Sequence, residues 1–160
     1  MELWDAYDKD LNRSDGAALN RGNPIPEGLF HLVCDVLVQH TDGSYLLMQR
    51  DRRKTFGGMW EATAGGSALR GESPMDCAIR ELYEETGIRA DQLIEVGRVR
   101  GRDAVYVEYL CVTAWEKDKI TLQDGETIAY KWVDGETLAA MNKDELITER
   151  MQDFIRKLRP

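Results

Sequence analysis

Three glutamates within one turn of a well-marked helix constrain this chain more than any other feature of its sequence. They stand at positions i, i+3 and i+4, namely Glu81, Glu84 and Glu85. This spacing puts all three side chains on one face of an α-helix. Ser73 is a favourable N-cap, a proline follows it, and Gly87 can adopt the left-handed conformation that ends a helix. We therefore expect a helix over residues 74–86.

The other side of this helix is apolar and is expected to pack into a core. Its residues recur at helical spacing, namely Met75, Ala78, Ile79, Leu82 and Thr86. The three glutamates are close enough to repel one another. A cation bound among them would offset this repulsion. Carboxylate oxygens suit Mg²⁺ or Mn²⁺. The sequence therefore predicts a helix that packs by one face and binds a divalent metal by the other.

The helix belongs to a longer pattern of fixed offsets. The pattern is Gly, five residues, Glu, seven residues, then Arg-Glu-aliphatic-any-Glu-Glu-any-Gly-aliphatic. It is occupied here by Gly66, Glu72, Arg80, Glu81, Leu82, Glu84, Glu85, Gly87 and Ile88. This run matches the Nudix box, and the chain resembles the Nudix hydrolase superfamily. The resemblance implies an α/β/α sandwich with a mixed central sheet. It also implies a Mg²⁺- or Mn²⁺-dependent hydrolase that cleaves a diphosphate bond, such as that of a nucleoside diphosphate linked to another group.

The resemblance also implies roles for individual residues. The metal ligands would be three carboxylates and one backbone carbonyl, those of Glu81, Glu84, Glu85 and Gly66. Arg80 and Glu72 would support them, and Arg80, Glu81 and Glu84 are candidate catalytic residues. Glu84 and Glu85 are expected to be the ligands most needed.

The general base is left open by the sequence. Some Nudix enzymes take it from the box and others from a later loop, where Glu126 is the candidate in this chain. The alternative is that Glu126 is a solvated carboxylate in an ordinary Asp-Gly-Glu turn.

A basic run in an otherwise acidic chain suggests a contact to substrate phosphates. It spans residues 49–54, and Arg50 and Arg52 are its candidate phosphate-binding residues. The alternative is a solvated loop that balances neighbouring acids. Trp60 is a candidate to stack on a base or sugar, although aromatic residues on predicted strands are more often part of the core.

Composition bounds the remaining possibilities. The chain has 160 residues, of which 42% are hydrophobic and 31% charged, and we expect one domain over residues 1–160. A net charge of −8 argues against a general nucleic-acid surface. Without a membrane-length apolar run or an N-terminal leader, we expect a cytoplasmic protein that does not bind membranes. The three cysteines have no metal-ligand spacing and are expected to be reduced thiols.

Hydrophobic patterning predicts alternating strands and two helices. The expected strands span residues 29–39, 45–49, 60–64, 93–99, 104–115 and 128–133, the first two forming a hairpin. Asn142 is expected to cap a second helix that continues to about residue 158, with Glu145 completing a capping box. Residues 1–28 are expected to add a strand or hairpin at the edge of the domain.

Within the superfamily, the chain looks most like the branch that includes isopentenyl diphosphate isomerase and its hydrolase-like relatives. The isomerase has a catalytic cysteine before the box glycine and a metal-binding histidine after it. Gly65 and Ser67 occupy those places here, which favours hydrolysis of a small-molecule diphosphate. An isomerase-like enzyme and a non-catalytic nucleotide sensor are the alternatives. Trp4 and Tyr7 could pair two copies of the chain in a homodimer.

Overall fold

The computed structural model describes residues 1–147 and 156–157. The strands are β1 (Leu3–Tyr7), β2 (Arg13–Asn20), β3 (His31–His40), β4 (Tyr45–Arg50), β5 (Trp60–Glu61), β6 (Thr63–Ser67), β7 (Ile94–Arg100), β8 (Ala104–Thr113) and β9 (Thr127–Val133). The helices are α1 (Pro74–Thr86) and α2 (Gly135–Ala140). Neither described helix is long and apolar enough to cross a membrane.

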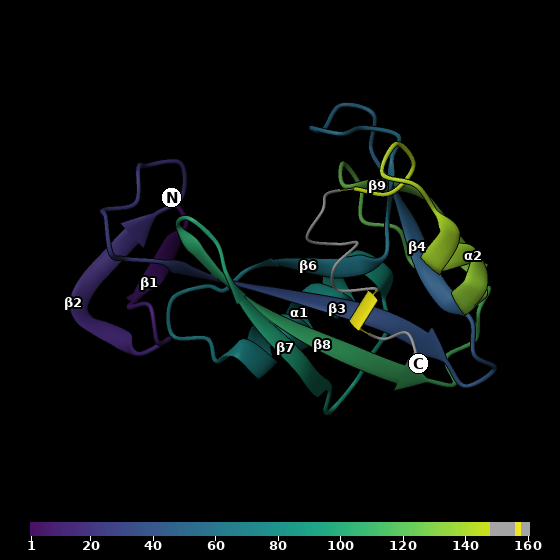
Figure 1. Ribbon diagram of the computed structural model, residues 1–160, viewed down its shortest axis with the longest axis horizontal. Helices are drawn as coiled ribbons and strands as arrows, with labels where there is room; N and C mark the ends of the chain where they lie inside the picture. The colour runs from purple at the N-terminus through teal and green to yellow at the C-terminus, as the bar shows by residue number, and fades with distance from the viewer. Residues whose placement is uncertain (148–155, 158–160) are drawn as a thin grey trace.

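A mixed sheet forms the centre of the molecule (Figure 1). Its main path runs β5-β4-β3-β8-β7, with β6 also paired to β3 and β9 to β4. β3 and β8 are parallel along their length, from His31 opposite Ala104 to His40 opposite Thr113, and the other pairings are antiparallel. The prediction of a mixed α and β fold around a large mixed sheet is confirmed.

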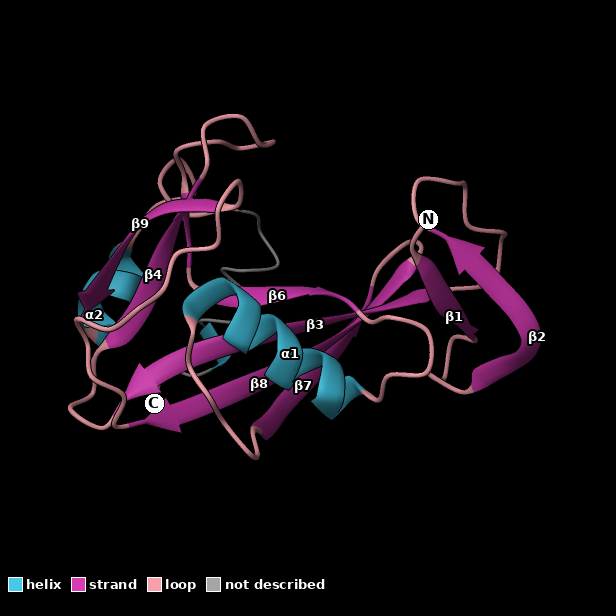
Figure 2. Ribbon diagram, turned by 180° about the vertical axis from the view of Figure 1, so that it is seen from behind, coloured by secondary structure: helices cyan, strands magenta, loops and turns pink. Residues whose placement is uncertain are grey.

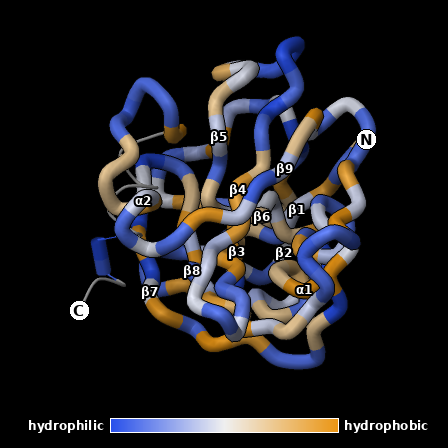
Figure 3. The backbone as a smooth tube through the Cα atoms, turned by 90° about the vertical axis from the view of Figure 1, so that its right-hand side faces the viewer, coloured by the Kyte–Doolittle hydropathy of each residue, from blue (hydrophilic) through white to orange (hydrophobic). Residues whose placement is uncertain are grey.

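Alternating side chains give the sheet two buried faces. Val36 and Val38 of β3 belong to one apolar cluster together with Leu82 of α1, whereas Leu37 belongs to a second cluster with Leu138 of α2. This is the period of two expected of a strand covered on both faces. Figure 2 shows α1 lying across one face of the sheet, and Figure 3 shows hydrophobic colour along β3 and β4 in the interior.

The helix predicted over residues 74–86 is present with both of its expected ends. The Ser73 hydroxyl accepts a hydrogen bond from the Asp76 N–H at 3.1 Å. Gly87 has a φ of 79° and donates its N–H to the Tyr83 carbonyl at 2.8 Å. Both ends are local features, and these contacts satisfy backbone groups that the helix leaves unpaired.

The first residues form a hairpin of β1 and β2 at one end of the long axis (Figure 1). It has its own small cluster, in which Trp4, Ala6 and Leu19 are buried. The Trp4 ring also stacks on His31, with 4.4 Å between the ring centroids. This contact joins the hairpin to the first residue of β3.

The prediction of a helix beginning at Asn142 is wrong for residues 143–147, whereas residues 156 and 157, inside the predicted range, are helical. Residues 143–145 form a turn, and Leu146 makes an isolated parallel bridge with Trp60. The Trp60 N–H donates to the Glu145 carbonyl at 2.8 Å, so these residues extend the edge of the sheet instead of starting a helix. The helix α2 lies earlier and is capped by Asp134, which the sequence analysis missed. Residues 148–155 and 158–160, where most of the predicted helix fell, lie outside the described residues.

The expected hairpin of the first two main strands is present at its turn but extends no further. β3 and β4 pair through Gln39 and Tyr45. Beyond that point β4 pairs with β9, while β6 takes the place beside β3. The two strands therefore diverge, and the candidate site lies where they separate.

Candidate functional site

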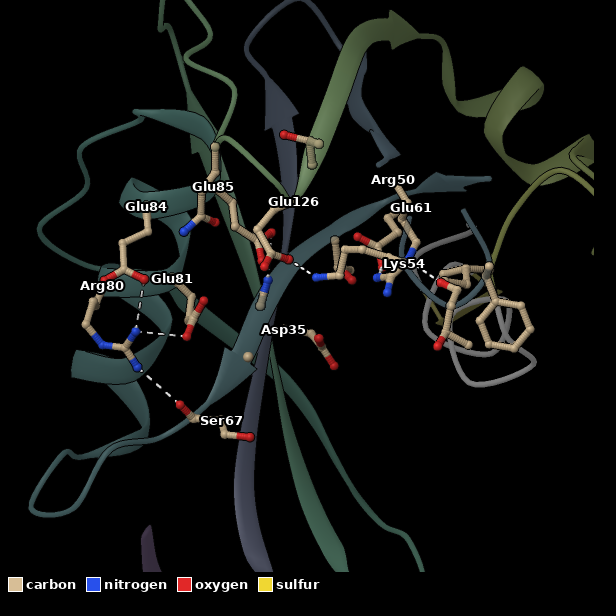
Figure 4. A pocket seen from close by; sticks show the side chains of 18 of the residues that line it. Asp35, Arg50, Lys54, Glu61, Ser67, Arg80, Glu81, Glu84, Glu85 and Glu126 are labelled. Atoms are coloured by element: carbon tan, nitrogen blue, oxygen red, sulfur yellow. Dashed lines mark hydrogen bonds and ion pairs between the residues drawn. The ribbon is translucent and has the colours of Figure 1, made fainter. Parts of the chain in front are cut away.

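A cavity of about 520 Å³ lies at this divergence, between α1, β6 and the loop that follows β4. Figure 4 shows acidic residues of α1 on one side, Arg50 and Lys54 on the other, and Asp35 and Glu126 between them. The cavity thus has a carboxylate wall and a basic wall.

The carboxylate wall is the predicted face of α1. Glu81, Glu84 and Glu85 all line the cavity. Gly66 of β6 lies against them so closely that a Cβ on it would be 2.6 Å from an oxygen of Glu81. Glycine at position 66 therefore leaves room for the Glu81 carboxylate against the strand backbone, and a larger residue would displace it.

Glu85 is the most deeply placed of the three glutamates. Burial raises the pKa of Glu85 well above its ordinary value, and the negative charges of Glu61 and Glu81 raise it further. The Gly65 N–H donates to its side chain at 3.3 Å. The pKa of Glu81 is also raised, mainly by burial, although Arg80 opposes this. Carboxylates in such surroundings are poorly solvated as anions and would be stabilised by a cation.

Arg80 organises the carboxylates along α1. Its Nε donates to Glu72 at 2.6 Å, and its Nη1 donates to Glu81 at 2.9 Å and to Glu84 at 3.2 Å. Its Nη2 donates to the Ser67 carbonyl at 3.1 Å, which ties the helix to β6. The sequence predicts that Arg80 and Glu72 support the glutamates, and in the structure Arg80 contacts Glu72, Glu81 and Glu84 directly.

Two further carboxylates enter the cavity that the sequence analysis did not name. Asp35 comes from the middle of β3 and Glu61 from β5. Burial raises the pKa of Glu61, and Arg50 opposes the increase. An aspartate inside the apolar run of residues 29–39 was a visible signal, because a charge in a strand buried on both faces requires an explanation. Glu61 carried no such signal.

The basic wall is built by the end of β4 and the loop after it. Arg50 donates to Glu61 at 2.6 Å and to the Thr55 carbonyl at 2.8 Å. Lys54 forms an ion pair with Glu126, which brings the later turn to the cavity. Burial lowers the pKa of Lys54, and the nearby charge of Arg50 lowers it further.

The N-terminal hairpin also reaches the cavity. Glu2 and Arg21 line its rim and are paired at 3.2 Å. These residues lie next to the two strands of the hairpin, and the sequence analysis gave them no role.

Two candidate substrate contacts do not line the cavity. Arg52 is exposed, and its guanidinium lies beside Gly58 in the loop. Trp60 packs against the second apolar cluster, and Lys131 lies over its ring at 4.2 Å. The interpretation of Trp60 as a core aromatic fits this position. Arg50, by contrast, is placed among the other polar groups of the site.

The donor set of the carboxylate wall fits a hard divalent cation. Carboxylate oxygens are the ligands that such an ion prefers, and the poorly solvated Glu85 would be stabilised by its positive charge. In the described part of the chain, no three acidic, histidine or cysteine side chains already converge as a metal cluster does. Arg80 holds Glu81 and Glu84 instead, because it is the nearest cation available to them.

The positions of the isomerase cysteine and histidine have different surroundings in this chain. A Cβ on Gly65 would lie 2.2 Å from the Cys34 carbonyl oxygen and 2.6 Å from an oxygen of Asp35. A cysteine cannot fit there without moving the backbone of β3. Ser67 lines the cavity, and its hydroxyl is 3.3 Å from Nδ1 of His31. Cys77 is a buried free thiol beside the Gly66 carbonyl, at 3.6 Å.

Comparison with known proteins assigns the class to which this fold and site belong. The NUDIX domain family matches residues 29–158, which is most of the chain. The chain therefore belongs to the Nudix family and is a hydrolase of diphosphate bonds. Enzymes of this family generally use divalent metal ions.

Particular relatives refine this placement. An uncharacterized Nudix hydrolase of Listeria monocytogenes is 29% identical over 148 residues, covering 88% of this chain and 85% of the relative. The isopentenyl-diphosphate Delta-isomerase of Streptomyces avermitilis is 36% identical over 101 residues, covering 62% of this chain and 49% of the enzyme. The predicted likeness to the isomerase branch is thus present but weaker.

Solved structures agree on the fold. The crystal structure of DR0079 from Deinococcus radiodurans has a TM-score of 0.80 at 15% identity, covering 99% of this chain and 100% of DR0079. The NUDIX domain of Shewanella oneidensis NrtR, solved with ADP ribose, has a TM-score of 0.63 at 20% identity, covering 80% and 85% of the two chains.

The raised pKa of Glu85 predicts an effect on stability. The metal-free Glu85→Gln variant should be more stable than the wild type by about 1–3 kcal/mol above the folded-state pKa, because the amide avoids a buried charge. The folded state holds the Glu85 proton more tightly than the unfolded state, so wild-type stability falls as pH rises through the folded pKa. The advantage of the variant should therefore shrink as pH is lowered. Urea unfolding with chelator at several pH values measures this, and an advantage of the variant that stays constant or shrinks as pH rises would contradict it.

Proposed function

We propose that this protein hydrolyses the diphosphate bond of a small molecule, with Mg²⁺ or Mn²⁺ bound to the carboxylate wall. The observation that carries the proposal is that a carboxylate wall and a basic wall face one another across one cavity. Glu81, Glu84 and Glu85 lie on one side, and Arg50 and Lys54 lie on the other. Cations on one wall suit the negative oxygens of a diphosphate, and carboxylates on the other suit the metal.

Glu81, Glu84 and Glu85 would hold the metal together with the Gly66 carbonyl. The bound ion would supply charge neutralisation of the phosphoryl oxygens and an acidified water. Arg80 and Glu72 would position the carboxylates, since Arg80 already contacts Glu72, Glu81 and Glu84. In this arrangement Arg80 would exchange part of its contact with Glu81 and Glu84 for the incoming cation.

The remaining chemistry is proton transfer and orientation of the substrate. Arg50 and Lys54 would bind phosphate oxygens and turn the scissile bond toward the carboxylate wall. Glu126 would accept a proton from the attacking water, because it lines the same cavity beside Lys54. A glutamate of the box, such as Glu84, is the other candidate for this base.

The preferred substrate is a nucleoside diphosphate linked to another group. The NUDIX domain of Shewanella NrtR forms a complex with ADP ribose, so ADP ribose is a suitable first probe for this chain. A panel of nucleotide sugars, dinucleoside polyphosphates, nucleoside triphosphates and prenyl diphosphates with Mg²⁺ or Mn²⁺ tests the class. Absence of metal-dependent phosphate or nucleotide release from the whole panel would contradict the proposal.

The isomerase alternative is the weaker one because Gly65 has no space for a cysteine side chain. A sensor without activity is also weaker, because binding alone gives no reason to gather the carboxylates of α1 around one cavity. Rearrangement of isopentenyl diphosphate would support the isomerase, and binding without turnover would support the sensor. A cytoplasmic location and a homodimer stay predictions.

Glu85→Gln should reduce kcat by about a hundredfold or more, because an amide is a poorer ligand for a hard cation than a carboxylate. Asp76→Asn is the matched control, since Asp76 is exposed on the same helix away from the cavity. Turnover of the best panel substrate measures both. Near-normal turnover of Glu85→Gln would remove Glu85 from the site.

Arg50→Gln should raise KM about tenfold or more, because a charge-assisted hydrogen bond to phosphate contributes about 1.5–3 kcal/mol. Arg52→Gln is the matched control from the same basic run and should leave KM unchanged, since Arg52 does not line the cavity. Steady-state kinetics on both variants distinguishes a phosphate contact from a general charge effect. Equal changes of KM in the two variants would indicate a general charge effect.

Glu126→Gln should lower kcat about a hundredfold with little change in Tm, as expected for removal of a general base. Asp124→Asn, an exposed acid of the same turn, should have no effect. An unchanged kcat in Glu126→Gln would show that Glu126 is only a turn carboxylate paired with Lys54. The general base would then be a glutamate of the Nudix box.

A further inference from the structure

The loop between β4 and β5 presents an aromatic side chain to solvent at the cavity. Phe56 lines the cavity and is 55% exposed. A phenylalanine exposed to this extent loses the burial that would otherwise stabilise it by about 1.5–3 kcal/mol. Because Phe56 also lines the cavity, its ring is available to a molecule bound there.

The backbone of Phe56 is also unusual. Its φ is 59°, in the left-handed region that a bulky side chain rarely adopts. Such a conformation costs about 1–2 kcal/mol relative to an ordinary one. Strain of this kind persists where the surrounding structure holds it, and it is found most often at functional sites.

Several contacts hold the loop in this shape. Arg50 donates its Nε to the Thr55 carbonyl at 2.8 Å, and the Met59 N–H donates to the Phe56 carbonyl at 3.2 Å. A Cβ on Gly57 would lie 2.4 Å from the Arg52 carbonyl oxygen, so the loop closes tightly just after Phe56. The same Arg50 that belongs to the basic wall thus fixes the backbone that presents the ring.

The rest of the cavity differs from Phe56 in chemistry. Of the described residues that line it, Phe56 is the aromatic one, Ile147 is the other large apolar one, and most of the others are charged or polar. A prenyl chain would need a continuous apolar wall, which these residues do not provide. A flat heteroaromatic base attached to phosphates needs one ring to stack on and cations nearby.

We propose that Phe56 stacks on the base of a nucleoside diphosphate whose phosphates lie between Arg50, Lys54 and the carboxylate wall. This assignment rests on the proposed function and narrows its substrate to nucleotide derivatives. Phe56 then determines specificity and takes no part in the chemical step. Thr55 separates it from Lys54, so base and phosphates would be held by one short loop.

Binding of two probes separates the base from the phosphates. Isothermal titration with ADP and with inorganic pyrophosphate, each with Mg²⁺, should show that Phe56→Ala weakens ADP binding about 5- to 100-fold, as expected for loss of one stacked base. Pyrophosphate affinity should be unchanged. Phe56→Tyr should keep ADP affinity within about twofold of wild type. Phe56→Asn, which tolerates the left-handed backbone, should behave like Phe56→Ala if the ring itself is responsible.

Ile94→Ala is the matched control, because Ile94 is a large apolar residue exposed on β7 and does not line the cavity. It should bind both probes as the wild type does. Thermal melting of each variant shows whether the loop still folds. If Phe56→Ala has a lower Tm than the wild type, the ADP and pyrophosphate affinities of Phe56→Asn are compared with those of the wild type instead.

The failures of the two proposals are distinguishable. Wild-type protein that hydrolyses no diphosphate of the panel contradicts the proposed function. Wild-type protein that is active, with Phe56→Ala binding ADP as tightly as wild type, contradicts only the role of Phe56. Equal loss of ADP and pyrophosphate binding in Phe56→Ala also overturns it, since the loop and not the ring would then matter. A change of sedimentation with unchanged ADP affinity would assign Phe56 to an interface between copies of the chain.

Discussion

The close packing of a glycine backbone in β6 between α1 and β3 is the constraint on which the site depends. Gly66 lets the Glu81 carboxylate approach the strand on one side, and Gly65 lets the strand lie against Asp35 and the Cys34 carbonyl on the other. A side chain at position 65 would push β3 away, and one at position 66 would displace the Glu81 carboxylate. The missing Cβ atoms allow this close approach, and the hydrogen bonds from Arg80 to the Ser67 carbonyl and from the Gly65 N–H to Glu85 hold α1 against β6.

This packing brings together charges that repel one another. Glu61, Glu81 and Glu85 are half-buried carboxylates, and the pKa of each is raised by removal from water. Arg80 and Arg50 offset part of the cost by holding Glu81 and Glu61, and the apolar clusters on both faces of the sheet provide the stability that permits it. Carboxylates with raised pKa values are common at functional sites, and their placement here is what the sequence pattern of α1 and the sheet pairing together produce.

How much of this could be predicted depends on whether the cause is local in sequence. The helix from Pro74 to Thr86 was predicted to the residue, because Ser73 and Gly87 act within a few residues of the helix ends. Contacts among residues far apart gave no such signal. Glu61 enters the site because β5 pairs with β4, and Leu146 joins a strand edge because it meets Trp60, which overrode an apparent helix cap at Asn142.

The residues of the candidate site also differ in whether a local sequence pattern predicts them. The carboxylates of α1 and their support by Arg80 followed from one short run of sequence. Arg52 and Arg50 looked equivalent because they lie two residues apart in one basic run, yet the loop directs only Arg50 to the cavity. Loop geometry decides such cases, and a backbone conformation like that of Phe56 cannot be inferred from residue type.

The tight fit around Gly65 has a consequence for protein engineering. A catalytic cysteine could not be introduced there by a single codon change, because its Cβ would collide with the main chain of the neighbouring strand. The strand would first have to be displaced, and β3 is anchored by pairing with β8 along its length. A cysteine at this particular position therefore requires redesign of the central sheet.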